Sequence, residues 1–321
     1  MKIGETFSPA GISSFFKPCQ AHVPHSTIDL RYVGAEGGGF VINLGVHTKL
    51  QVEKSCKRVV DVYINGRPAP DALTTRTVVE KILNMVKGNH DYRVKVKHQV
   101  EVPIGAGYGS SAAGALSTSL GLVELLDLPL TITEAAMIAH VSEIECGTGL
   151  ATVAPLLTGG CVLQRGCGGP GISKILRIPV EEGVKIVSVF FGPIYTKKAV
   201  SNPEFMESVM KAGSEALNRI NDHPELESFM KESRRFSQRL GLQTHKVKVA
   251  MDLMDDLGAI GAAQNMIGEA VHGAFYQEDV EKALEVLENR LGKRRLYVSG
   301  IYLTRLADFD LRELQPYEFA R

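Results

Sequence analysis

A glycine-rich segment limits the possible fold and binding site of this chain more than any other part of the sequence does. Residues 103–114 read Pro-Ile-Gly-Ala-Gly-Tyr-Gly-Ser-Ser-Ala-Ala-Gly. Glycine at every second position lets the backbone take positive φ and approach a bulky polyanion, and the two serines then open a helix whose free N–H groups and dipole favour phosphate. The segment therefore predicts a phosphate-binding loop. The residues expected to contact a nucleotide are Pro103, Gly105, Ala106, Gly107, Tyr108, Gly109, Ser110, Ser111 and Ala112.

The helix predicted after this loop has its own pattern, because Leu116, Leu120, Val123 and Leu126 recur at helical spacing. Two other phosphate loops do not fit. The segment has no Gly-Lys-Ser/Thr, and the dinucleotide pattern G-x-G-x-x-G would need glycine where Ser110 stands. A simple helix cap would need only one glycine or serine, so the repeated glycines and serines of this segment favour a phosphate-binding loop over a cap.

Charge and cysteine content narrow the class of protein. The 321 residues include 36 basic and 36 acidic side chains, so a nucleic-acid partner, which needs a basic surface, is not expected. No uncharged apolar run is long enough to span a membrane, and no signal peptide is predicted at the amino terminus. Five cysteines without C-x-x-C spacing favour free thiols in a reducing cytoplasm over a disulfide framework.

The order of predicted elements indicates an α+β fold with a mixed sheet in each half. Strands are expected at 40–44, 59–64, 185–191 and 296–303, and helices near 71–87, 111–126 and 133–145. The turn Cys167-Gly168-Gly169-Pro170-Gly171 divides the chain. We therefore expect one domain over residues 1–170, which carries the loop, and a second over residues 171–321.

The string P-x-G-x-G-x-G-S-S-A-A resembles the phosphate loop of the GHMP small-molecule kinases. Phe7-Ser8-Pro9-Ala10-Gly11 and residues 258–268, which contain three glycines, are similar to the first and third motifs of that family. The resemblance implies a ribosomal-protein-like amino-terminal domain and a ferredoxin-like carboxy-terminal domain. It also implies an ATP-dependent alcohol phosphotransferase that uses Mg²⁺.

Three further segments resemble the archaeal pantoate kinases within that family. They are Ser8-Pro9-Ala10-Gly11-Ile12 followed by Phe15-Phe16, residues 143–150 with the sequence Glu-Ile-Glu-Cys-Gly-Thr-Gly-Leu, and Gln264-Asn265-Met266-Ile267-Gly268. The resemblance implies phosphorylation of the primary hydroxyl of pantoate in archaeal coenzyme A biosynthesis. A homodimer is compatible with the sequence.

Magnesium bound to ATP takes only one or two protein oxygens. Ser111 is the first candidate, because the second serine of the family's loop faces the metal. Glu143 is the second, since it shares a helical stripe with Ala136 and His140. Glu145 is the rival, and a carboxylate at a helix end is often simply solvated.

A general base is missing where the family provides one. The resemblance to pantoate kinases implies the sequence Gly-Thr-Gly-Leu-Gly-Asp-Val at this point. Residues 147–153 read Gly-Thr-Gly-Leu-Ala-Thr-Val instead, so Thr152 replaces the expected aspartate. A threonine cannot accept a proton near neutral pH. The following residues resemble homoserine kinases, which act without an aspartate base. We therefore assign no base and expect Thr152 to hydrogen-bond the acceptor hydroxyl.

A substrate carboxylate would need a cation, and a bidentate arginine suits it best. Arg31 and Arg165 are the candidates, together with His25 in a long amino-terminal loop that could cover the substrate. Each of these side chains could equally be a solvated surface group.

Three classes of function remain open from the sequence. An ATP-dependent kinase comes first, with pantoate as the favoured acceptor and homoserine or mevalonate as alternatives. A nicotinamide oxidoreductase would need an acidic residue about 20 positions past the glycines, and Glu124 lies too close to them. A noncatalytic nucleotide-binding protein on the same fold would explain the missing aspartate.

Overall fold

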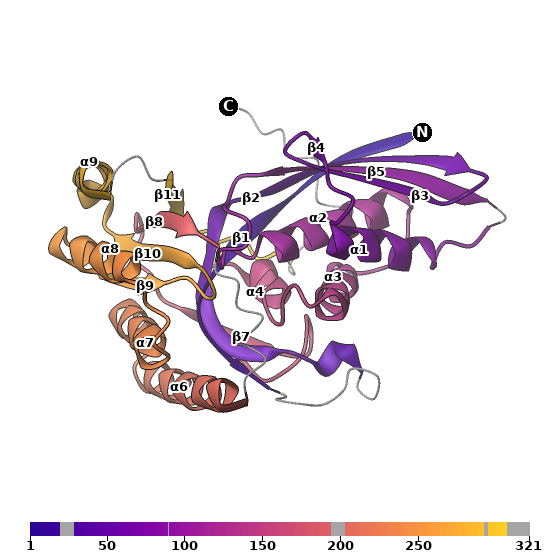
Figure 1. The fold of residues 1–321 in the computed structure, drawn as a ribbon. Helices are drawn as coiled ribbons and strands as arrows, with labels where there is room; N and C mark the ends of the chain where they lie inside the picture. Colours follow the sequence, from indigo (N-terminus) through magenta and orange to yellow (C-terminus); the bar gives the residue numbers. More distant parts are fainter. Residues whose placement is uncertain (20–28, 89, 194–202, 292–294, 307–321) are drawn as a thin grey trace.

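The chain forms two β-sheets, each covered by helices, as the α+β prediction requires (Figure 1). The computed structural model describes residues 1–19, 29–88, 90–193, 203–291 and 295–306. Seven strands form the first sheet and four form the second. The chain passes from the first sheet to the second between residues 178 and 185.

The first sheet has the strand order β4-β3-β5-β2-β6-β7, and β1 pairs with β2. Among the described strands of this sheet, only β3 and β5 pair in parallel. The strands are β1 (Lys2–Pro18), β2 (Ala35–Ser55), β3 (Val59–Ile64), β4 (Arg67–Pro68), β5 (Asp91–Val100), β6 (Cys161–Arg165) and β7 (Lys174–Ile178). Because β7 pairs with β6, this sheet continues past residue 170, and the division into domains at that residue stays a prediction.

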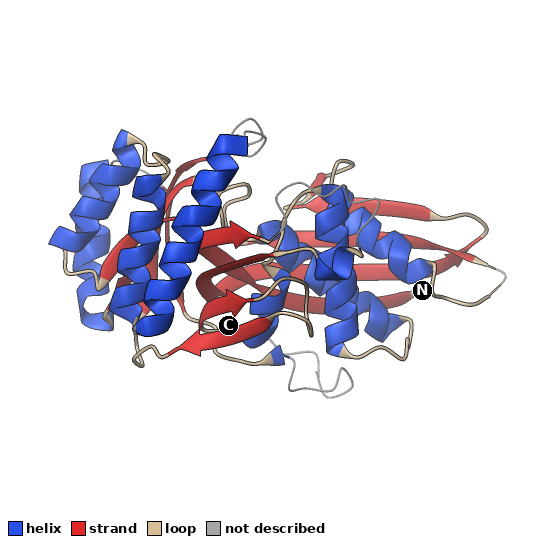
Figure 2. Cartoon of the chain, turned by 90° about the horizontal axis from the view of Figure 1, so that it is seen from below, coloured by secondary structure: helices blue, strands red, loops and turns tan. Residues whose placement is uncertain are grey.

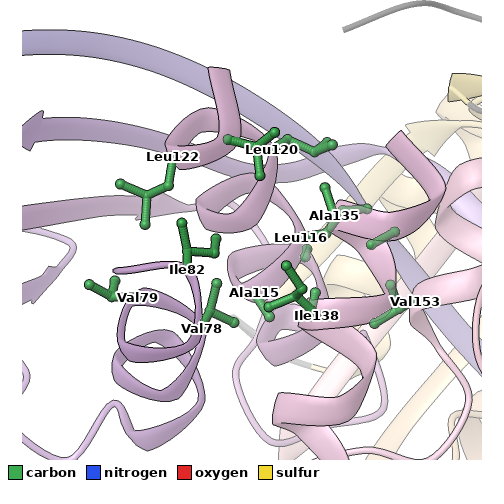
Figure 3. Packing of buried hydrophobic residues seen from close by; sticks show 14 of the residues in the cluster. Val78, Val79, Ile82, Ala115, Leu116, Leu120, Leu122, Ala135, Ile138 and Val153 are labelled. Atoms are coloured by element: carbon green, nitrogen blue, oxygen red, sulfur yellow. The ribbon is translucent and has the colours of Figure 1, made fainter. Parts of the chain in front are cut away.

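Three helices cover one face of this sheet. They are α1 (Leu73–Leu83), α2 (Ser110–Leu125) and α3 (Ile132–Cys146), followed by the short α4 (Val153–Thr158), while the 3-10 turn η2 (Leu30–Tyr32) precedes β2. The expected helices near 71–87, 111–126 and 133–145 are thus confirmed. Figure 3 shows side chains of α1, α2 and α3, such as Ile82, Leu116 and Ile138, directed toward one another. This aliphatic core fixes α2 beneath the glycine-rich loop.

The second sheet is antiparallel, with the order β11-β8-β10-β9. Its strands are β8 (Lys185–Gly192), β9 (Gly261–Gln264), β10 (Glu269–Phe275) and β11 (Arg295–Gly300). Its helices are α6 (Pro203–Asp222), α7 (Leu226–Arg239), α8 (His245–Asp256) and α9 (Val280–Leu291), with the turn η3 (Gln277–Asp279) before α9. Figure 2 shows these helices grouped at one end of the molecule.

A shared apolar core joins the two halves. Phe15 on β1 and Phe40 on β2 meet Phe229 on α7, with ring centroids 5.9 Å and 5.3 Å from it. The same cluster includes Tyr108 of the glycine-rich loop, whose side chain is buried. Burying large aromatic side chains across the boundary stabilises one arrangement of the two sheets. The loop therefore lies where the two halves meet.

One expectation about the cysteines is wrong. Cys19, after the end of β1, and Cys167, after β6, form a disulfide with a Cα–Cα distance of 5.8 Å. Cys56, Cys146 and Cys161 are free. The sequence separation of 148 residues gave no spacing signal, because strand pairing alone brings these two cysteines together.

Candidate active site

The glycine-rich loop has the backbone that its sequence predicts. It joins β5 to α2, and Gly105, Gly107 and Gly109 have φ angles of +76°, +75° and +59°. Gly109 is the N-cap of α2 and has no side chain to cap the helix, and no side-chain capping hydrogen bond is formed there among the described residues. The amides of the first turn are therefore left for a ligand or solvent, as an anion site requires.

Two parts of the chain hold the loop from opposite sides. On one side, the Gly107 carbonyl accepts a hydrogen bond from the Ser13 amide (3.0 Å), and the Tyr108 carbonyl accepts one from the Gly11 amide (3.1 Å). On the other side lies the turn between β9 and β10, where a Cβ on Gly107 would be 2.8 Å from the Met266 carbonyl oxygen. The backbone of the loop is thus fixed between β1 and the second sheet.

The nucleotide-contact residues expected from the sequence do not all expose side chains. Those of Pro103, Ala106, Tyr108 and Ala112 are buried. We therefore expect these four to act through their backbone, while Ser110 and Ser111 keep partly exposed side chains.

Ser111 and Glu143 lie in contact, as a shared metal site requires. The Ser111 hydroxyl donates to Glu143 Oε1, and the Thr148 hydroxyl donates to the same oxygen at 2.8 Å. Glu143 is only 3% exposed. Burial raises its pKa above the usual range, while hydrogen bonds from Ser111 and Thr148 oppose that rise. A Cβ on Gly149 would lie 2.2 Å from Glu143 Oε2, so a side chain there would displace the carboxylate.

The chemistry of this pair fits Mg²⁺. A buried carboxylate is costly without a cation, and no ion pair among the described residues involves Glu143. The described residues contain no cluster of three or more acidic, histidine or cysteine ligands. One carboxylate and one hydroxyl beside a phosphate loop suit a cation whose other ligands are phosphates and water.

Glu145, the rival candidate, faces elsewhere. Its carboxylate lies 2.7 Å from Lys81 Nζ and is 37% exposed. The capping box between Thr131 and Glu134 defines where α3 begins. In the resulting helix, Glu143 lies on the buried face and Glu145 on the exposed face. The structure thus separates two carboxylates that the sequence left in competition.

A pocket opens next to the loop, between β1, β2, β6 and α4. It is lined by Gly11, Ile12, Ser13, Phe15, Phe16, Ala35, Glu36, Gly37, Gly38, Gly39, Phe40, Val41, Ala151, Thr152, Pro155, Val162 and Gln164. Thr152 is the N-cap of α4, and its methyl group would be 2.6 Å from a Cβ on Gly109 and 3.2 Å from one on Gly11. Thr152 therefore stands between the last glycine of the loop and this pocket.

Sequence reasoning missed two polar side chains in the pocket wall. Glu36 pairs with Lys17 and accepts a hydrogen bond from the Gly166 amide (2.9 Å). Burial raises the pKa of Glu36, but these hydrogen bonds outweigh burial and leave it below its usual value. Gln164 is 3% exposed, and its Oε1 has no hydrogen-bond partner among the described residues. No local motif marks either residue, because the pairing of β2 with β6 assembles this wall.

The expected substrate cations do not line this pocket. Arg165 binds the Asn221 side chain at the surface, and Arg31 forms an ion pair with Asp29 and is 59% exposed. His25 lies outside the described residues. The roles of these three residues stay predictions.

Comparison with known proteins adds independent findings. Residues 74–160 match the family model of the GHMP kinases N terminal domain. A pantoate kinase from Methanocaldococcus jannaschii is 29% identical over 287 residues, covering 88% of this chain and 97% of that protein. A pantoate kinase from Thermococcus kodakarensis is 27% identical, covering 88% of this chain and 91% of its own length.

Solved structures share the whole fold. A phosphotransferase related to the CoA biosynthesis pathway matches with a TM-score of 0.83 and 27% identity, covering 95% of this chain and 97% of that one. A homoserine kinase from Cytophaga hutchinsonii matches with a TM-score of 0.68 and 17% identity, covering 95% and 96% of the two chains, which shows a common fold. No helix among the described residues is long and apolar enough to cross a membrane.

Proposed function

The chain belongs to the GHMP kinase superfamily, and from that premise we propose that it transfers the γ-phosphoryl group of ATP to the primary hydroxyl of pantoate. The products are 4-phosphopantoate and ADP, and the reaction serves archaeal coenzyme A biosynthesis. The observation that carries the proposal is the buried contact between Ser111 and Glu143 at the start of the helix that follows the glycine-rich loop. The acceptor is a small molecule, and the reaction takes place in the cytoplasm, where ATP is available.

The loop binds the triphosphate through its backbone. Amides at the start of α2 face the phosphates, and Gly105, Gly107 and Gly109 let the chain approach them without a side chain in the way. Glu143 and Ser111 would hold Mg²⁺, which neutralises phosphate charge when it is bound. Glu143 suits this role because no cationic side chain among the described residues already neutralises it.

The acceptor binds in the pocket beside Thr152. Its apolar wall of Ile12, Phe15 and Phe40 would contact the two methyl groups of pantoate, and the Thr152 hydroxyl would orient the primary hydroxyl toward the loop. Among the described residues that line the pocket, Glu36 carries the only carboxylate. Glu36 lines the pocket, but Lys17 and the Gly166 amide lower its pKa, which makes it a weak base. Phosphoryl transfer through a loose transition state depends mainly on in-line positioning and charge neutralisation.

One observation favours a second candidate. Thr152 occupies the position where the resemblance to pantoate kinases implies an aspartate. Homoserine kinases act without that base. A homoserine kinase also shares the fold. Homoserine is therefore the alternative acceptor.

A panel of acceptors tests the proposal. The protein with ATP and Mg²⁺ is mixed separately with pantoate, homoserine, mevalonate and galactose, and ADP release and the ³¹P NMR spectrum of the product are recorded. We expect the highest kcat/KM with pantoate and a phosphate on its primary hydroxyl. A higher value with another acceptor would assign a different substrate. ATP binding without acceptor-dependent ADP release would mean a noncatalytic protein.

A further inference from the structure

The way α3 ends places a threonine beside the carboxylate of the candidate metal site. Gly147 follows the helix with a φ of +62°, and its amide donates to the Ile144 carbonyl (3.1 Å). The Thr148 amide donates to the Glu143 carbonyl (3.0 Å). This pair of hydrogen bonds is the Schellman arrangement, in which a glycine in the left-handed region turns the chain back over the last turn of the helix. The helix end therefore brings Thr148 to Glu143.

Three oxygens lie near the Thr148 hydroxyl, which has one hydrogen to donate. Glu143 Oε1 lies at 2.8 Å, the Thr74 hydroxyl on α1 at 2.9 Å, and the Glu143 carbonyl oxygen at 3.4 Å. An ionised carboxylate can only accept, and Oε1 is the nearest acceptor, so the hydrogen of Thr148 goes to Oε1. The Thr74 hydroxyl then donates to the Thr148 oxygen. The hydrogen bonds thus run in one direction, from Thr74 through Thr148 to the carboxylate.

This hydrogen-bonded chain connects a second helix with the carboxylate. Thr74 is the second residue of α1 and is only 7% exposed, whereas Thr148 lies at the surface. A buried hydroxyl needs a hydrogen-bond partner, and Thr148 supplies it. Because α1 packs against α3, the position of α1 is transmitted to Glu143 through these two hydroxyls.

The donors around Glu143 all reach the same oxygen. Ser111 and Thr148 both donate to Oε1, and no donor among the described residues reaches Oε2. Gly149 follows Thr148, and a Cβ there would lie 2.2 Å from Oε2, so the glycine keeps that side of the carboxylate clear. Hydrogen bonds to one oxygen fix the rotation of the carboxylate and leave the other oxygen open to a cation.

We propose that Thr148 and Thr74 are positioning residues for Mg²⁺: Thr148 holds Glu143 so that Oε2 is available to the cation, and Thr74 holds the Thr148 hydroxyl. The inference rests on the proposed function for the identity of the metal and the nucleotide. Both threonines act through Glu143. Hydrogen-bond partners that orient a metal ligand typically contribute about 10- to 100-fold to metal affinity or activity.

Nucleotide binding with and without Mg²⁺ tests this role without turnover. Calorimetry on the full-length protein measures the affinity for a non-hydrolysable ATP analogue, once with Mg²⁺ and once with EDTA. Thr148→Val keeps the shape and removes the hydroxyl, and we expect affinity for the Mg²⁺-loaded analogue to fall about tenfold. Affinity for the metal-free analogue should stay within about twofold of native, which also shows that the variant is folded.

Thr148→Ser is the conservative variant, because it retains the hydroxyl. It should recover most of the affinity for the Mg²⁺-loaded analogue. Native affinity of Thr148→Val for that analogue would overturn the proposal. An equal loss with Mg²⁺ and with EDTA would overturn it as well, since packing or direct nucleotide contact would then explain the effect.

The contribution of α1 is tested with a matched pair of threonines. Thr77 lies three residues after Thr74, and its hydroxyl is 3.4 Å from Cys146 Sγ on α3, so it links the same two helices without reaching Glu143. Thr74→Val should lower affinity for the Mg²⁺-loaded analogue about fivefold, as for one hydrogen bond between neutral groups. Thr77→Val should stay within about twofold of native. Equal effects of the two variants would contradict the role of Thr74.

A double variant tests whether Thr74 acts through Thr148. When Thr148→Val is already present, Thr74→Val should cause no further loss, because the intermediate hydroxyl is gone. A further loss equal to that of Thr74→Val alone would show two independent effects and reject the hydrogen-bonded chain.

The experiment contains no acceptor, so its outcome is separate from that of the acceptor panel. A Mg²⁺-dependent loss in Thr148→Val together with no phosphorylation of any acceptor would uphold the inference and reject the proposed function. Phosphorylation of pantoate together with native metal-dependent binding in Thr148→Val would reject the inference alone. If Mg²⁺ does not strengthen binding of the analogue to the native protein, these threonines position no metal and the inference is wrong.

Discussion

The phosphate loop and the acceptor pocket lie side by side, but they are built in different ways. The loop is one contiguous segment whose shape comes from three glycines with positive φ and from backbone hydrogen bonds. The pocket is assembled by side chains from β1, β2, β6 and the start of α4. Under the proposed function, the loop would determine whether nucleotide binds at all, whereas the pocket would determine which alcohol reacts and how fast.

The largest expected effect is in the loop. Gly107→Val places a branched side chain at φ +75°, within 3 Å of the Met266 carbonyl, so we expect no measurable ATP binding by calorimetry. Gly66→Val is the matched control. Its φ is +80°, but nothing lies within 4 Å of a Cβ there, and ATP affinity should be native. Native ATP affinity in Gly107→Val would remove the loop from the nucleotide site.

The metal pair should give the next largest effect. Glu143→Gln removes the charge of one proposed ligand and Ser111→Ala removes the hydroxyl of the other, and we expect kcat to fall by about 10²- to 10³-fold, since a bound metal would act chiefly on transition-state charge. Steady-state assays at saturating ATP measure this. Glu145→Gln is the control, because its carboxylate pairs with Lys81 at the surface. A larger loss from Glu145→Gln than from Glu143→Gln would mean that the metal site has been misassigned.

The contrast between a contiguous loop and a pocket assembled from separate segments also explains which features could be predicted from the sequence. Gly105, Gly107 and Gly109 encode their own conformation, so the loop and the helix after it follow from local chemistry. Helical spacing alone selects Glu143 as a candidate, and the packing of α3 against α1 and α2 buries Glu143 and leaves Glu145 exposed, while the metal role of Glu143 stays a prediction. Element types were likewise predictable from periodicity.

Contacts between distant segments could not be predicted in this way. Glu36 and Gln164 reach the pocket only because β2 pairs with β6, and Cys19 meets Cys167 for a similar reason. The buried hydrogen bond between Ser14 and His272 joins residues 258 positions apart, and nothing in the surrounding sequence marks it. Register and packing, rather than residue type, determine these contacts.

Substitutions in the acceptor pocket should lower activity less than substitutions in the loop do. Thr152→Val removes the hydroxyl and keeps the shape, and we expect kcat to fall about 10- to 100-fold, the effect of one hydrogen bond to a group that becomes charged. ATP affinity should stay native. Thr152→Ser keeps the hydroxyl and should recover most of the rate. Equal losses in Thr152→Val and Thr152→Ser would point to packing against Gly109 as the role of this residue.

The smallest expected effect concerns stability rather than activity. Burial lowers the pKa of His98 to about 4 from an ordinary value of 6.5. Between these two pH values the His98 imidazole is protonated in the unfolded chain and neutral in the folded one. The contribution of neutral, buried His98 to the free energy of unfolding is therefore present above pH 6.5 and is lost as pH falls toward 4. Urea unfolding at several pH values measures it. His98→Gln should flatten this dependence, and His90→Gln, at an exposed histidine, should not. The same slope in all three proteins would contradict a neutral buried His98.

The pH dependence of the chemical step tests the central claim most directly, namely that ATP and Mg²⁺ bound at the phosphate loop react with an acceptor that Thr152 only positions. The rate of pantoate phosphorylation is measured in single turnovers at saturating ATP and Mg²⁺ in the native protein, Thr152→Val and Glu36→Gln. We predict that no single ionisation near pH 4 to 6 governs the rate, and that Thr152→Val lowers it evenly across pH. A steep rise through this range that persists in Thr152→Val would mean that a carboxylate acts as the base, and loss of the rise in Glu36→Gln would identify that carboxylate.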